Sequence, residues 1–533
     1  MRALERRSRI AMQEAVPMKP LVSVVVPMFN ARTTVARALE SLQRQTLAQW
    51  GAIVVDDGST DGSADVVRGM AQEDARITLL HQPNRGPGAA RNAGIERADG
   101  WFLHFLDADD WLEPAGLRTL VDRASEGATG EGRGGGPGGG MGGAAFGRVR
   151  LVGPEGQVIG ANTGRLSALP PGSAAGRIGL NDLLEDNPIS LSAAIVRRDL
   201  LGDVRFNEHQ RFALDYDLWL RLALRGVTFR AAPDVVGVYR LRPGGQSRNV
   251  VEQLRSIDTF LADAYAAARE TPLARRGSPL DASDTRRTLV MASFALRRAT
   301  ALALDPATHH HPQPHGDTRE RVASAVDLFA PYADHARRLG WTVGSADAGR
   351  AAFESILHTS CASPSLTGAW TGALAAFWNA CVERGWTDHA MIEGARRELA
   401  LQLVEPDHIA ATLLDRASAQ GRTVTIVGLG NNGRTLAAAA IARGMKVLGR
   451  DDALPPGDPS APKGVTIEPA HAPLARDGAV ILSPLLDDVL VARLEPAAPG
   501  RVLRWSAVRA SLASDILREL DLAFGAQPAR LVA

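Results

Sequence analysis

The chain has 533 residues, and its 60 lysine and arginine residues nearly balance 59 aspartate and glutamate residues, for a formal net charge of +1. This length predicts two or three domains, and the balanced charge gives no electrostatic case for nucleic-acid binding. The only cysteines, Cys361 and Cys381, have neither zinc-site spacing nor the number of a disulfide framework, which fits a reducing cytoplasm. No run of about 18 apolar residues occurs, so no membrane-spanning helix is expected.

Residues 1–20 form a basic leader, beginning MRALERRSRIAM, that runs into no apolar segment. It does not have the pattern of a secretory signal, and we predict a flexible tail. The alternative is peripheral contact with the inner face of an anionic membrane, where each Lys or Arg contributes about 1 kcal/mol.

From Leu21 onward, the hydrophobic pattern predicts strands that alternate with helices. The predicted strands are Leu21–Pro27, Ala52–Val55, Ile77–Leu80 and a run ending at Asp107; the predicted helices are Thr33–Gln45, one from Ala64, and Ala89–Ala98. This alternation predicts an α/β fold with a doubly wound, mostly parallel sheet.

The run WFLHFLDADDW ends the fourth predicted strand in Asp107, Asp109 and Asp110. Carboxylates at positions i and i+2 can reach one divalent cation, which usually keeps coordination positions open for substrate phosphates. Asp-rich turns also end strands simply because Asp tolerates turn geometry. The run alone therefore does not decide between a metal site and an ordinary turn.

Two other polar clusters follow predicted strands: residues 27–30 after the first, and Asp56 with Asp57 after the second. Ligands of parallel sheets bind beyond the carboxyl ends of the strands, where such loops converge. The coincidence of three clusters favours a ligand site over turn chemistry.

The runs VSVVVPMFN, VVDDGSTDGS and NRGPGAARNAGIERADGWFLHFLDADDWLEP resemble the catalytic domain of the family 2 glycosyltransferases, which have the GT-A nucleotide-sugar-binding fold. The resemblance covers about Leu21 to Pro114 and resumes over residues 187–248. It implies an inverting enzyme that moves a sugar from a nucleoside-diphosphate sugar to an acceptor hydroxyl with Mn or Mg. The acceptor would be a glycan, a lipid-linked molecule or another hydroxyl compound, in surface glycan or polysaccharide synthesis.

On this resemblance, Asp56 or Asp57 would accept hydrogen bonds from the nucleobase or ribose, a role open to either carboxylate. Pro27 and Phe29 would border the base, and Arg91 of ARNAG would lie near the sugar nucleotide.

Asp107 and Asp109 match the DXD motif of the family. The first carboxylate would approach the ribose or the metal, and the second would ligate the metal. Asp110 would orient the loop.

The segment RFALDYDLWLRLALRG, residues 211–226, resembles the family stretch in which an acidic pair precedes an amphipathic helix. Asp215 aligns with the catalytic base, and Leu214 stands where many relatives have Glu. Asp217 is a rival for this role, and the helix dipole alone can explain either carboxylate. Tyr216 and Trp219 would serve packing or the acceptor side.

The other parts of the chain carry weaker patterns. Residues 126–143 are glycine-rich and predict a flexible loop inside a glycosyltransferase domain spanning 21–250. Residues 251–420 are rich in Ala, Leu and Arg with helical spacing. The cluster His309–His315 is interrupted by prolines and predicts a solvated loop rather than a metal site.

A C-terminal domain, 421–533, begins TVTIVGLGNNGRTLAAAAIARGMKVLGRDD. Gly428, Gly430 and Gly433 lie between a predicted strand and a predicted helix, and an acidic pair follows the next strand, as in a Rossmann fingerprint. The segment looks like small Rossmann-like modules, similar to the N-terminal part of sugar acetyltransferases. It would bind a nucleotide or dinucleotide; the alternative is that its glycines only permit tight strand-helix packing.

Two classes of function therefore compete. One is the glycosyltransferase; the other is a catalytically degenerate nucleotide-sugar-binding or regulatory protein whose C-terminal module acts as a nucleotide sensor. Retention of the DXD carboxylates and of Asp215 favours the enzyme. A nucleotidyltransferase is disfavoured, because the first strand is not followed by the glycine-rich, basic loop of that class.

Overall fold

The structure is a computed structural model. It describes residues 19–126, 143–153, 158–160, 176–241, 249–271, 282–304, 318–360, 370–404, 406–421, 423–427, 431–450, 464–467, 479–482 and 501–525. The chain divides into two compact units: residues 1–158 with 162–290, and residues 159–161 with 291–533. Among the described residues, no helix is both long and apolar enough to cross a membrane.

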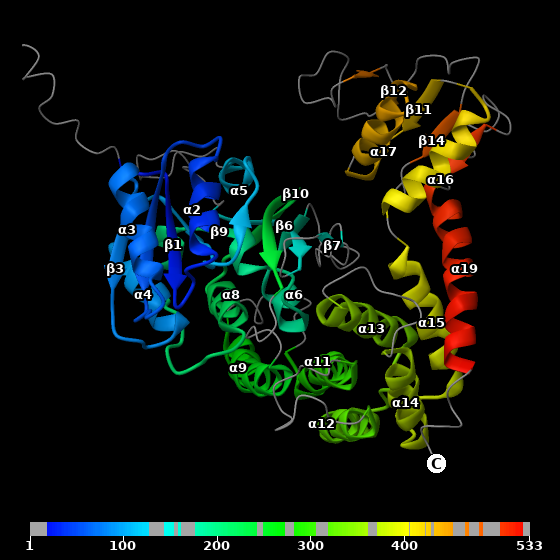
Figure 1. The fold of residues 1–533 in the computed structure, drawn as a ribbon. Coiled ribbons are helices and arrows are strands. Elements are labelled where there is room, and N and C mark those ends of the chain that lie inside the picture. Colours follow the sequence, from blue (N-terminus) through cyan, green and yellow to red (C-terminus); the bar gives the residue numbers. More distant parts are fainter. Residues whose placement is uncertain are drawn as a thin grey trace, which may run out of the picture. The chain divides into compact units, whose positions relative to one another are not determined.

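The first unit is built on one large sheet with the strand order β3-β2-β1-β4-β9-β6-β10-β5, with β8 beside β10 (Figure 1). Its strands are β1 (Val22–Met28), β2 (Trp50–Asp56), β3 (Ile77–His81), β4 (Phe102–Phe105), β5 (Trp111–Leu112), β6 (Ala144–Val152), β8 (Arg177–Ile178), β9 (Ala194–Arg197) and β10 (Phe229–Arg240); β7 is Val158–Gly160. Its helices are α2 (Val35–Gln43), α3 (Ser63–Glu73), α4 (Pro87–Arg97), α5 (Gly116–Ser125), α6 (Leu180–Glu185), η3 (Leu191–Ala193), α7 (Arg198–Leu201), α8 (Leu214–Leu224) and α9 (Val250–Glu270).

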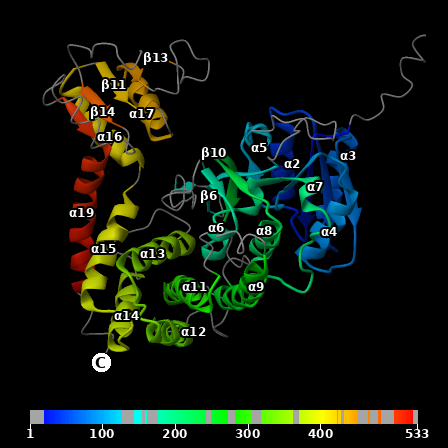
Figure 2. The same cartoon turned by 180° about the vertical axis from the view of Figure 1, so that it is seen from behind.

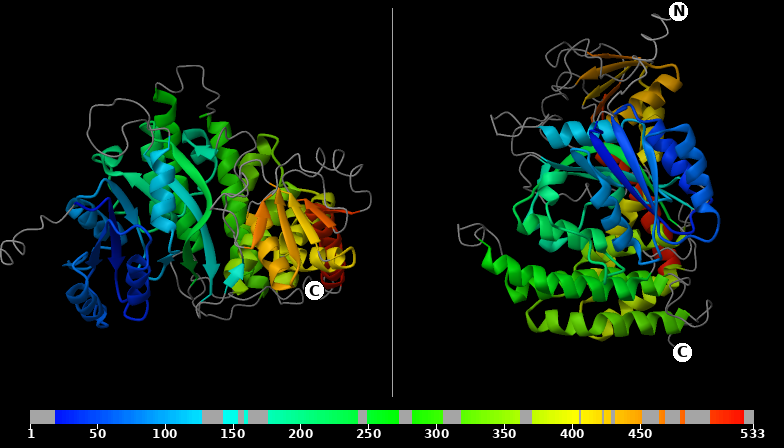
Figure 3. Two further views of the ribbon diagram at one scale, coloured as in Figure 1. Left: turned by 90° about the horizontal axis from the view of Figure 1, so that it is seen from above. Right: turned by 90° about the vertical axis from the view of Figure 1, so that its left-hand side faces the viewer.

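The four strands β3, β2, β1 and β4 are all parallel, and helices connect them in turn. This confirms the predicted doubly wound sheet. The other half is mixed: β9 is antiparallel to β4 and to β6, whereas β6 and β10 are parallel. Figure 3 shows how strongly the sheet twists.

The sequence of β1 explains its central place in the sheet. Val22, Val24, Val25 and Val26 are completely buried, as expected for a parallel strand covered on both faces. Helix α4 lies directly against this strand: a Cβ added to Gly94 would come 2.3 Å from Cγ1 of Val25, so only glycine fits. This close contact fixes α4, and with it Arg91, relative to the sheet.

The second unit contains helices and a smaller sheet (Figure 2). α11 (Asp284–Leu304) passes from the first unit into the second, and the further helices are α12 (Thr318–Arg338), α13 (Ser345–Ser360), α14 (Trp370–Glu383), α15 (His389–Leu403), α16 (Pro406–Ser418), α17 (Asn431–Ala442) and α19 (Trp505–Gly525). They agree with the helical pattern of residues 251–420. Cys381 is buried in α14, and burial raises the pKa of its thiol to about 12, so this thiol is inert as a nucleophile.

The smaller sheet is parallel at every pairing and has the order β13-β12-β11-β14-β15. Its strands are β11 (Thr423–Val427), β12 (Lys446–Arg450), β13 (Val465–Ile467), β14 (Ala479–Leu482) and β15 (Val502–Arg504). Helix α17 connects β11 to β12, and the strand order reverses between β11 and β14.

Candidate functional site

The ends of β1, β2 and β4 meet at one edge of the large sheet. Met28 pairs with Asp56 across β1 and β2. Val25 pairs with Phe105 across β1 and β4, so two residues further on Pro27 and Asp107 reach the same edge. The predicted clusters after the first, second and fourth strands are therefore neighbours in space.

Hydrogen bonds between side chains and backbone join the loops that follow β1 and β2. The amide of Asn30 donates to Oγ of Ser59 at 2.9 Å, and the amide of Thr60 donates to Oδ1 of Asn30 at 2.9 Å. Asn30 has φ 48°, a left-handed conformation that Asn tolerates better than most residues. The two loops therefore hold each other in place.

A second set of bonds continues this connection around Asp61 and Ser63. Oδ2 of Asp61 accepts from the amide of Arg32 at 3.0 Å, and Oγ of the buried Ser63 accepts from the amide of Ala31 at 2.8 Å. The Ser63 hydroxyl also donates to Oδ1 of Asp61, and this bond lowers the pKa of the Asp61 carboxyl. Sequence reasoning missed these residues, although the Asp/Ser spacing of DDGSTDGS is typical of side chains that bond nearby backbone.

Asp56 and Asp57 are both buried but have different partners. Asp57 accepts from the side chain of Gln82 at 2.7 Å and from the amides of Arg85 and Gly86 at 2.9 and 2.8 Å. It therefore shapes the loop that enters α4.

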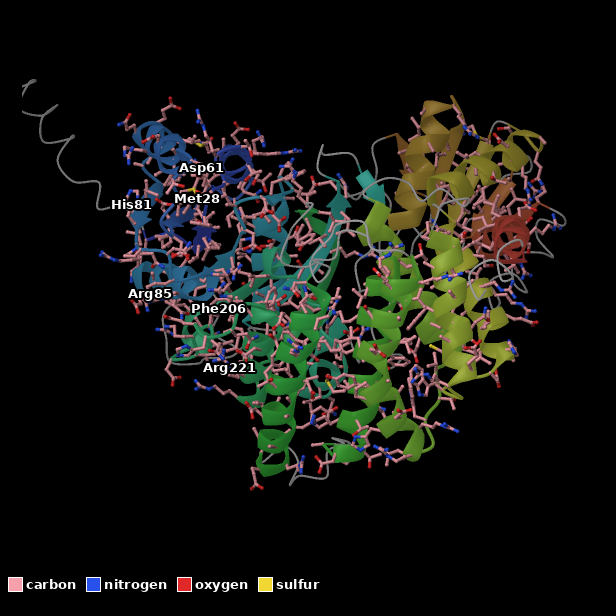
Figure 4. All side chains as sticks on the ribbon, turned by 60° about the horizontal axis from the view of Figure 1, so that its bottom comes forward. Met28, Asp61, His81, Arg85, Phe206 and Arg221 are labelled. Atoms are coloured by element: carbon pink, nitrogen blue, oxygen red, sulfur yellow. The ribbon has the colours of Figure 1, made fainter. Side chains whose placement is uncertain are left out.

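Asp56 accepts from the amide of Ser59 at 3.0 Å, and its Oδ2 lies 3.0 Å from Nδ1 of His81. A carboxylate can accept about four hydrogen bonds, so Asp56 retains more acceptor capacity than Asp57. Figure 4 labels His81 at the end of β3 and Asp61 on the neighbouring loop.

Arg91 and Asp107 form an ion pair, with Nη2 of Arg91 2.6 Å from Oδ1 of Asp107. The side chain of Arg91 is only 8% exposed, and that of Asp107 is 31% exposed. A buried guanidinium thus holds the first carboxylate of the acidic run after β4, while that carboxylate still reaches solvent.

The other two carboxylates of this run differ in burial. Asp109 is partly exposed. Asp110 is buried, and it accepts from Oγ of Ser192 at 2.6 Å and from the amide of Arg240 at 3.0 Å. Burial, followed by the charges of Asp109 and Asp107, raises the pKa of Asp110 well above its ordinary value. Asp110 therefore ties the loop to η3 and β10.

The two acidic residues of α8 also differ. Asp217 is buried and forms a salt bridge of 2.6 Å with Arg221, one turn along the helix. Asp215 is partly exposed, and its Oδ2 accepts from Nδ2 of Asn187 at 3.3 Å. Asn187 is itself fixed, because its Oδ1 accepts from the amide of Ile189 at 3.1 Å. Sequence reasoning assigned Asn187 no contact with Asp215.

Tyr216 and Trp219 are packing residues. The Tyr216 hydroxyl donates to the carbonyl of Leu183 at 2.6 Å, and the fully buried Trp219 ring meets Phe229 edge-on at 5.3 Å. At the other side of the site, Phe29 is 51% exposed, which leaves its ring available for contact with a flat ligand.

Several predicted features lie outside the described residues. These are Gly428, Gly430, the acidic pair Asp451 and Asp452, the cluster 309–315 and nearly all of the leader 1–20 and the loop 126–143. Gly433 lies in α17, but its surroundings are not described.

A parallel α/β sheet whose strand ends carry clustered carboxylates defines a ligand-binding domain of the doubly wound class. A family model described as Glycosyl transferase family 2 matches residues 23–132. The succinoglycan biosynthesis protein ExoO of Rhizobium meliloti is 30% identical over 263 residues, which cover 49% of this chain and 71% of that protein. The chain therefore belongs to glycosyl transferase family 2.

Other similarities are more local. A GalNAc(5)-diNAcBac-PP-undecaprenol beta-1,3-glucosyltransferase of Campylobacter jejuni is 38% identical over 110 residues, 20% of this chain and 36% of that protein. This chain spans only 31% to 36% of the length of that relative and of others. The crystal structure of S. aureus TarS matches with a TM-score of 0.38 and 17% identity over 64% of this chain and 55% of that chain.

Proposed function

We propose that this family 2 glycosyltransferase is an inverting, metal-dependent enzyme that moves a sugar from a nucleoside-diphosphate sugar to an acceptor hydroxyl. The observation that carries the proposal is the meeting of Asp56, Asp107 and Pro27 at one sheet edge. The two acidic residues of α8 support it, because Asp217 is buried in a salt bridge with Arg221, whereas the candidate base Asp215 is partly exposed.

The carboxylates fit a divalent cation such as Mn or Mg. Asp107 and Asp109 are both partly exposed, and such ions prefer oxygen ligands. Among the described residues no group of three His, Cys, Asp or Glu side chains is placed to hold a metal. We propose that one or two carboxylates hold the ion and that substrate phosphates complete its coordination. When bound, the ion would neutralise charge on the leaving diphosphate.

The protein residues would bind and orient the donor. We assign the nucleobase or ribose contact to Asp56, since Asp57 already accepts three hydrogen bonds from the α4 loop. Pro27 and Phe29 would border the base. Arg91 would hold Asp107 in place beside the diphosphate.

Asp215 would accept the proton of the acceptor hydroxyl as that oxygen attacks the anomeric carbon. The bond from the Asn187 side-chain amide, 3.3 Å long, would hold the Asp215 carboxylate in position for this role. A single in-line displacement inverts the configuration at the anomeric carbon.

ExoO and the Campylobacter jejuni glucosyltransferase support a role in surface glycan or polysaccharide synthesis. The second of these acts, by its name, on an undecaprenol-linked glycan. We propose a glycan or lipid-linked acceptor, and an enzyme that works in the cytoplasm at the inner face of the membrane. The basic leader would supply peripheral contact there.

Transfer from a panel of nucleotide sugars, with and without Mn or Mg, tests this function. Asp215→Asn should lower turnover by roughly 100-fold to 10,000-fold, the usual contribution of a general base, while binding of the nucleoside diphosphate stays intact. Asp217→Asn is the matched control one half-turn away and should leave turnover within a few-fold. Parent-rate transfer by Asp215→Asn would show that the base lies elsewhere.

The alternative is a catalytically degenerate, nucleotide-sugar-binding or regulatory protein. It is favoured if the protein binds nucleotide sugars but neither transfers nor hydrolyses them with either metal. The partly exposed Asp107, Asp109 and Asp215 argue against it, because a degenerate site has no need to keep three carboxylates accessible.

For the remaining chain we propose a glycosyltransferase domain over 21–250, a helical region over 251–420 and a Rossmann-like domain over 421–533. The all-parallel strand order of the smaller sheet, with its reversal between β11 and β14, supports a Rossmann-like fold. We propose that a nucleotide or dinucleotide binds near Gly428, Gly430 and Gly433.

A further inference from the structure

Phe206 lies in the loop between α7 and α8 and is 2% exposed. Its ring meets Phe105 of β4 edge-on, with centroids 5.1 Å apart and an interplanar angle of 88°. The guanidinium carbon of Arg91 lies 5.3 Å from the centroid of the Phe206 ring, within the range of a cation–π contact. Phe206 thus joins the end of β4 to the arginine that holds the DXD motif. Figure 4 labels Phe206 in this position.

Asn92 of α4, the residue next to Arg91, forms two hydrogen bonds with the backbone of Phe206. Nδ2 of Asn92 donates to the Phe206 carbonyl at 2.9 Å, and the Phe206 amide donates to Oδ1 of Asn92 at 2.8 Å. Both bonds are buried. Because one side chain makes both bonds, the backbone that carries the Phe206 ring is fixed relative to α4.

The residues that follow Phe206 strengthen the same attachment. Glu208 accepts from Nδ2 of Asn92 at 3.0 Å and from Nη2 of Arg85 at 2.7 Å. The backbone also packs closely here: a Cβ added to Gly88 would lie 3.2 Å from the carbonyl oxygen of Asn207. The loop is therefore attached to α4 along several consecutive residues.

Arg91 depends on this attachment for its orientation. Its buried Nε has no hydrogen-bond acceptor among the described residues, and its Nη2 donates to Oδ1 of Asp107. A guanidinium is planar, so its bonds to a carboxylate depend on the direction of that plane. The Phe206 ring is the neighbour that can set the direction of the guanidinium plane of Arg91.

We infer that Phe206, held by Asn92, is a positioning residue that fixes the guanidinium of Arg91 against Asp107 and so orients the first carboxylate of the DXD motif. The inference rests on the proposed function. Phe206 acts through Arg91 and touches neither donor nor acceptor.

The test is a double-mutant cycle measured on the full chain by calorimetric titration with UDP and with GDP, each in the presence of Mn. Phe206→Leu keeps apolar volume but removes the aromatic face, and we expect it to weaken binding roughly threefold to thirtyfold, the range of a partly buried cation–π contact. In an Arg91→Met background the same change should cost less than about twofold, because no cation remains beside the ring. An equal loss in both backgrounds would overturn the inference.

Phe146→Leu is the matched control, since Phe146 is a fully buried ring in β6 of the same unit. It should leave nucleotide affinity unchanged even if it lowers the melting temperature as much as Phe206→Leu does. If Phe206→Leu binds nucleotide as tightly as this control, the inference fails. If the parent protein binds none of UDP, GDP, CDP, ADP and dTDP with Mn, the proposed function fails instead.

Should Phe206→Leu prevent folding, Asn92→Ala examines the same connection, because it leaves the ring but removes both bonds to its backbone. It should weaken binding several-fold in the parent and have little further effect in the Arg91→Met background. Parent-like affinity in Asn92→Ala would contradict the role assigned to the attachment.

Discussion

Three carboxylates follow β4 within four positions, and the structure gives each a different environment. Asp107 pairs with a buried arginine, Asp109 is partly exposed, and Asp110 is buried against Ser192 and the amide of Arg240. A carboxylate can ligate a metal only if an oxygen remains accessible. The two accessible carboxylates are therefore the ones that match the DXD motif.

Asp109→Ala should abolish the stimulation of transfer by Mn or Mg, because it removes a partly exposed carboxylate that is a proposed ligand of the metal. Turnover against metal concentration measures this. Asp122→Ala is a control for the loss of a carboxylate, because Asp122 forms a surface i,i+4 pair with Arg118. It should leave turnover and its dependence on metal concentration unchanged. Unaltered metal dependence in Asp109→Ala would refute the assignment.

From the buried environment of His104 we predict that the free energy of unfolding depends on pH. Its Nδ1 lies 2.8 Å from the carbonyl of Ala194, so Nδ1 carries the proton of the neutral ring. Burial lowers the pKa of His104 to about 4, although the bond to Ala194 and the charge of Asp107 act to raise it. The unfolded state therefore binds more protons between pH 6.5 and 4, so stability is complete above pH 6.5 and falls as the pH drops through about 4.

The loss over that window should be on the order of 3 kcal/mol. Urea unfolding between pH 7 and 4 measures it, and His104→Leu should show a flatter dependence. The raised pKa of Asp110 acts in the opposite direction, since its native form binds protons more tightly, but it is common to both proteins and cancels in the difference. Equal slopes in the two proteins would rule His104 out as the cause.

At the scale of elements, the site is made by strand register and by loops that bond to each other. The β1–β2 and β1–β4 registers bring the clusters together, and the bonds of Asn30, Asp61 and Ser63 keep the two loops in one arrangement. Helix α8 begins in a similarly specific way: Ala213 has φ 53°, a left-handed conformation that is strained for alanine, directly before Leu214 and Asp215.

Ser63→Ala should leave the buried amide of Ala31 without an acceptor and lower the free energy of unfolding by about 1–3 kcal/mol. It should also weaken binding of UDP or GDP, because the loop after β1 loses its anchor. Ser23→Ala is a matched control: Ser23 is a buried serine that accepts from the amide of Gly100 at 3.0 Å, at the other end of β1. We expect a similar loss of stability there but full nucleotide affinity. Equal affinities in the two variants would count against the loop's role in binding.

At the scale of the whole molecule, the sequence predicted the parallel half of the large sheet, the helical region and the clustering at the strand ends. Each depends on local periodicity or on the general rule that strand ends converge. The antiparallel place of β9 and the contacts of Asn187 and Phe206 were not predicted, because they join residues more than 25 positions apart through the folded chain. The different partners of Asp215 and Asp217 could not be predicted either, because Asn187 lies 28 positions from Asp215.

The second unit yields its own prediction. If the C-terminal sheet binds a nucleotide, NAD, NADP or a nucleotide sugar at a concentration of 100 Kd should stabilise that unit by about 2.7 kcal/mol, visible as a raised melting temperature. Gly430→Val should remove this shift and leave glycosyl transfer intact. If none of these ligands stabilises the protein, the glycines serve packing alone.

The bond between the Arg240 amide and Asp110 joins residues 130 positions apart, and this has a consequence for the newborn protein. Ribosomes add about 5–20 residues per second, so Arg240 emerges roughly 7 to 26 seconds after Asp110. The parallel half of the sheet is complete by Phe105 and can form early, while the acidic loop lacks its final anchor. A nascent chain could therefore contain the folded strands β1 to β4 well before it contains α8 with Asp215. Glycosyl transfer would then begin only after synthesis has passed β10.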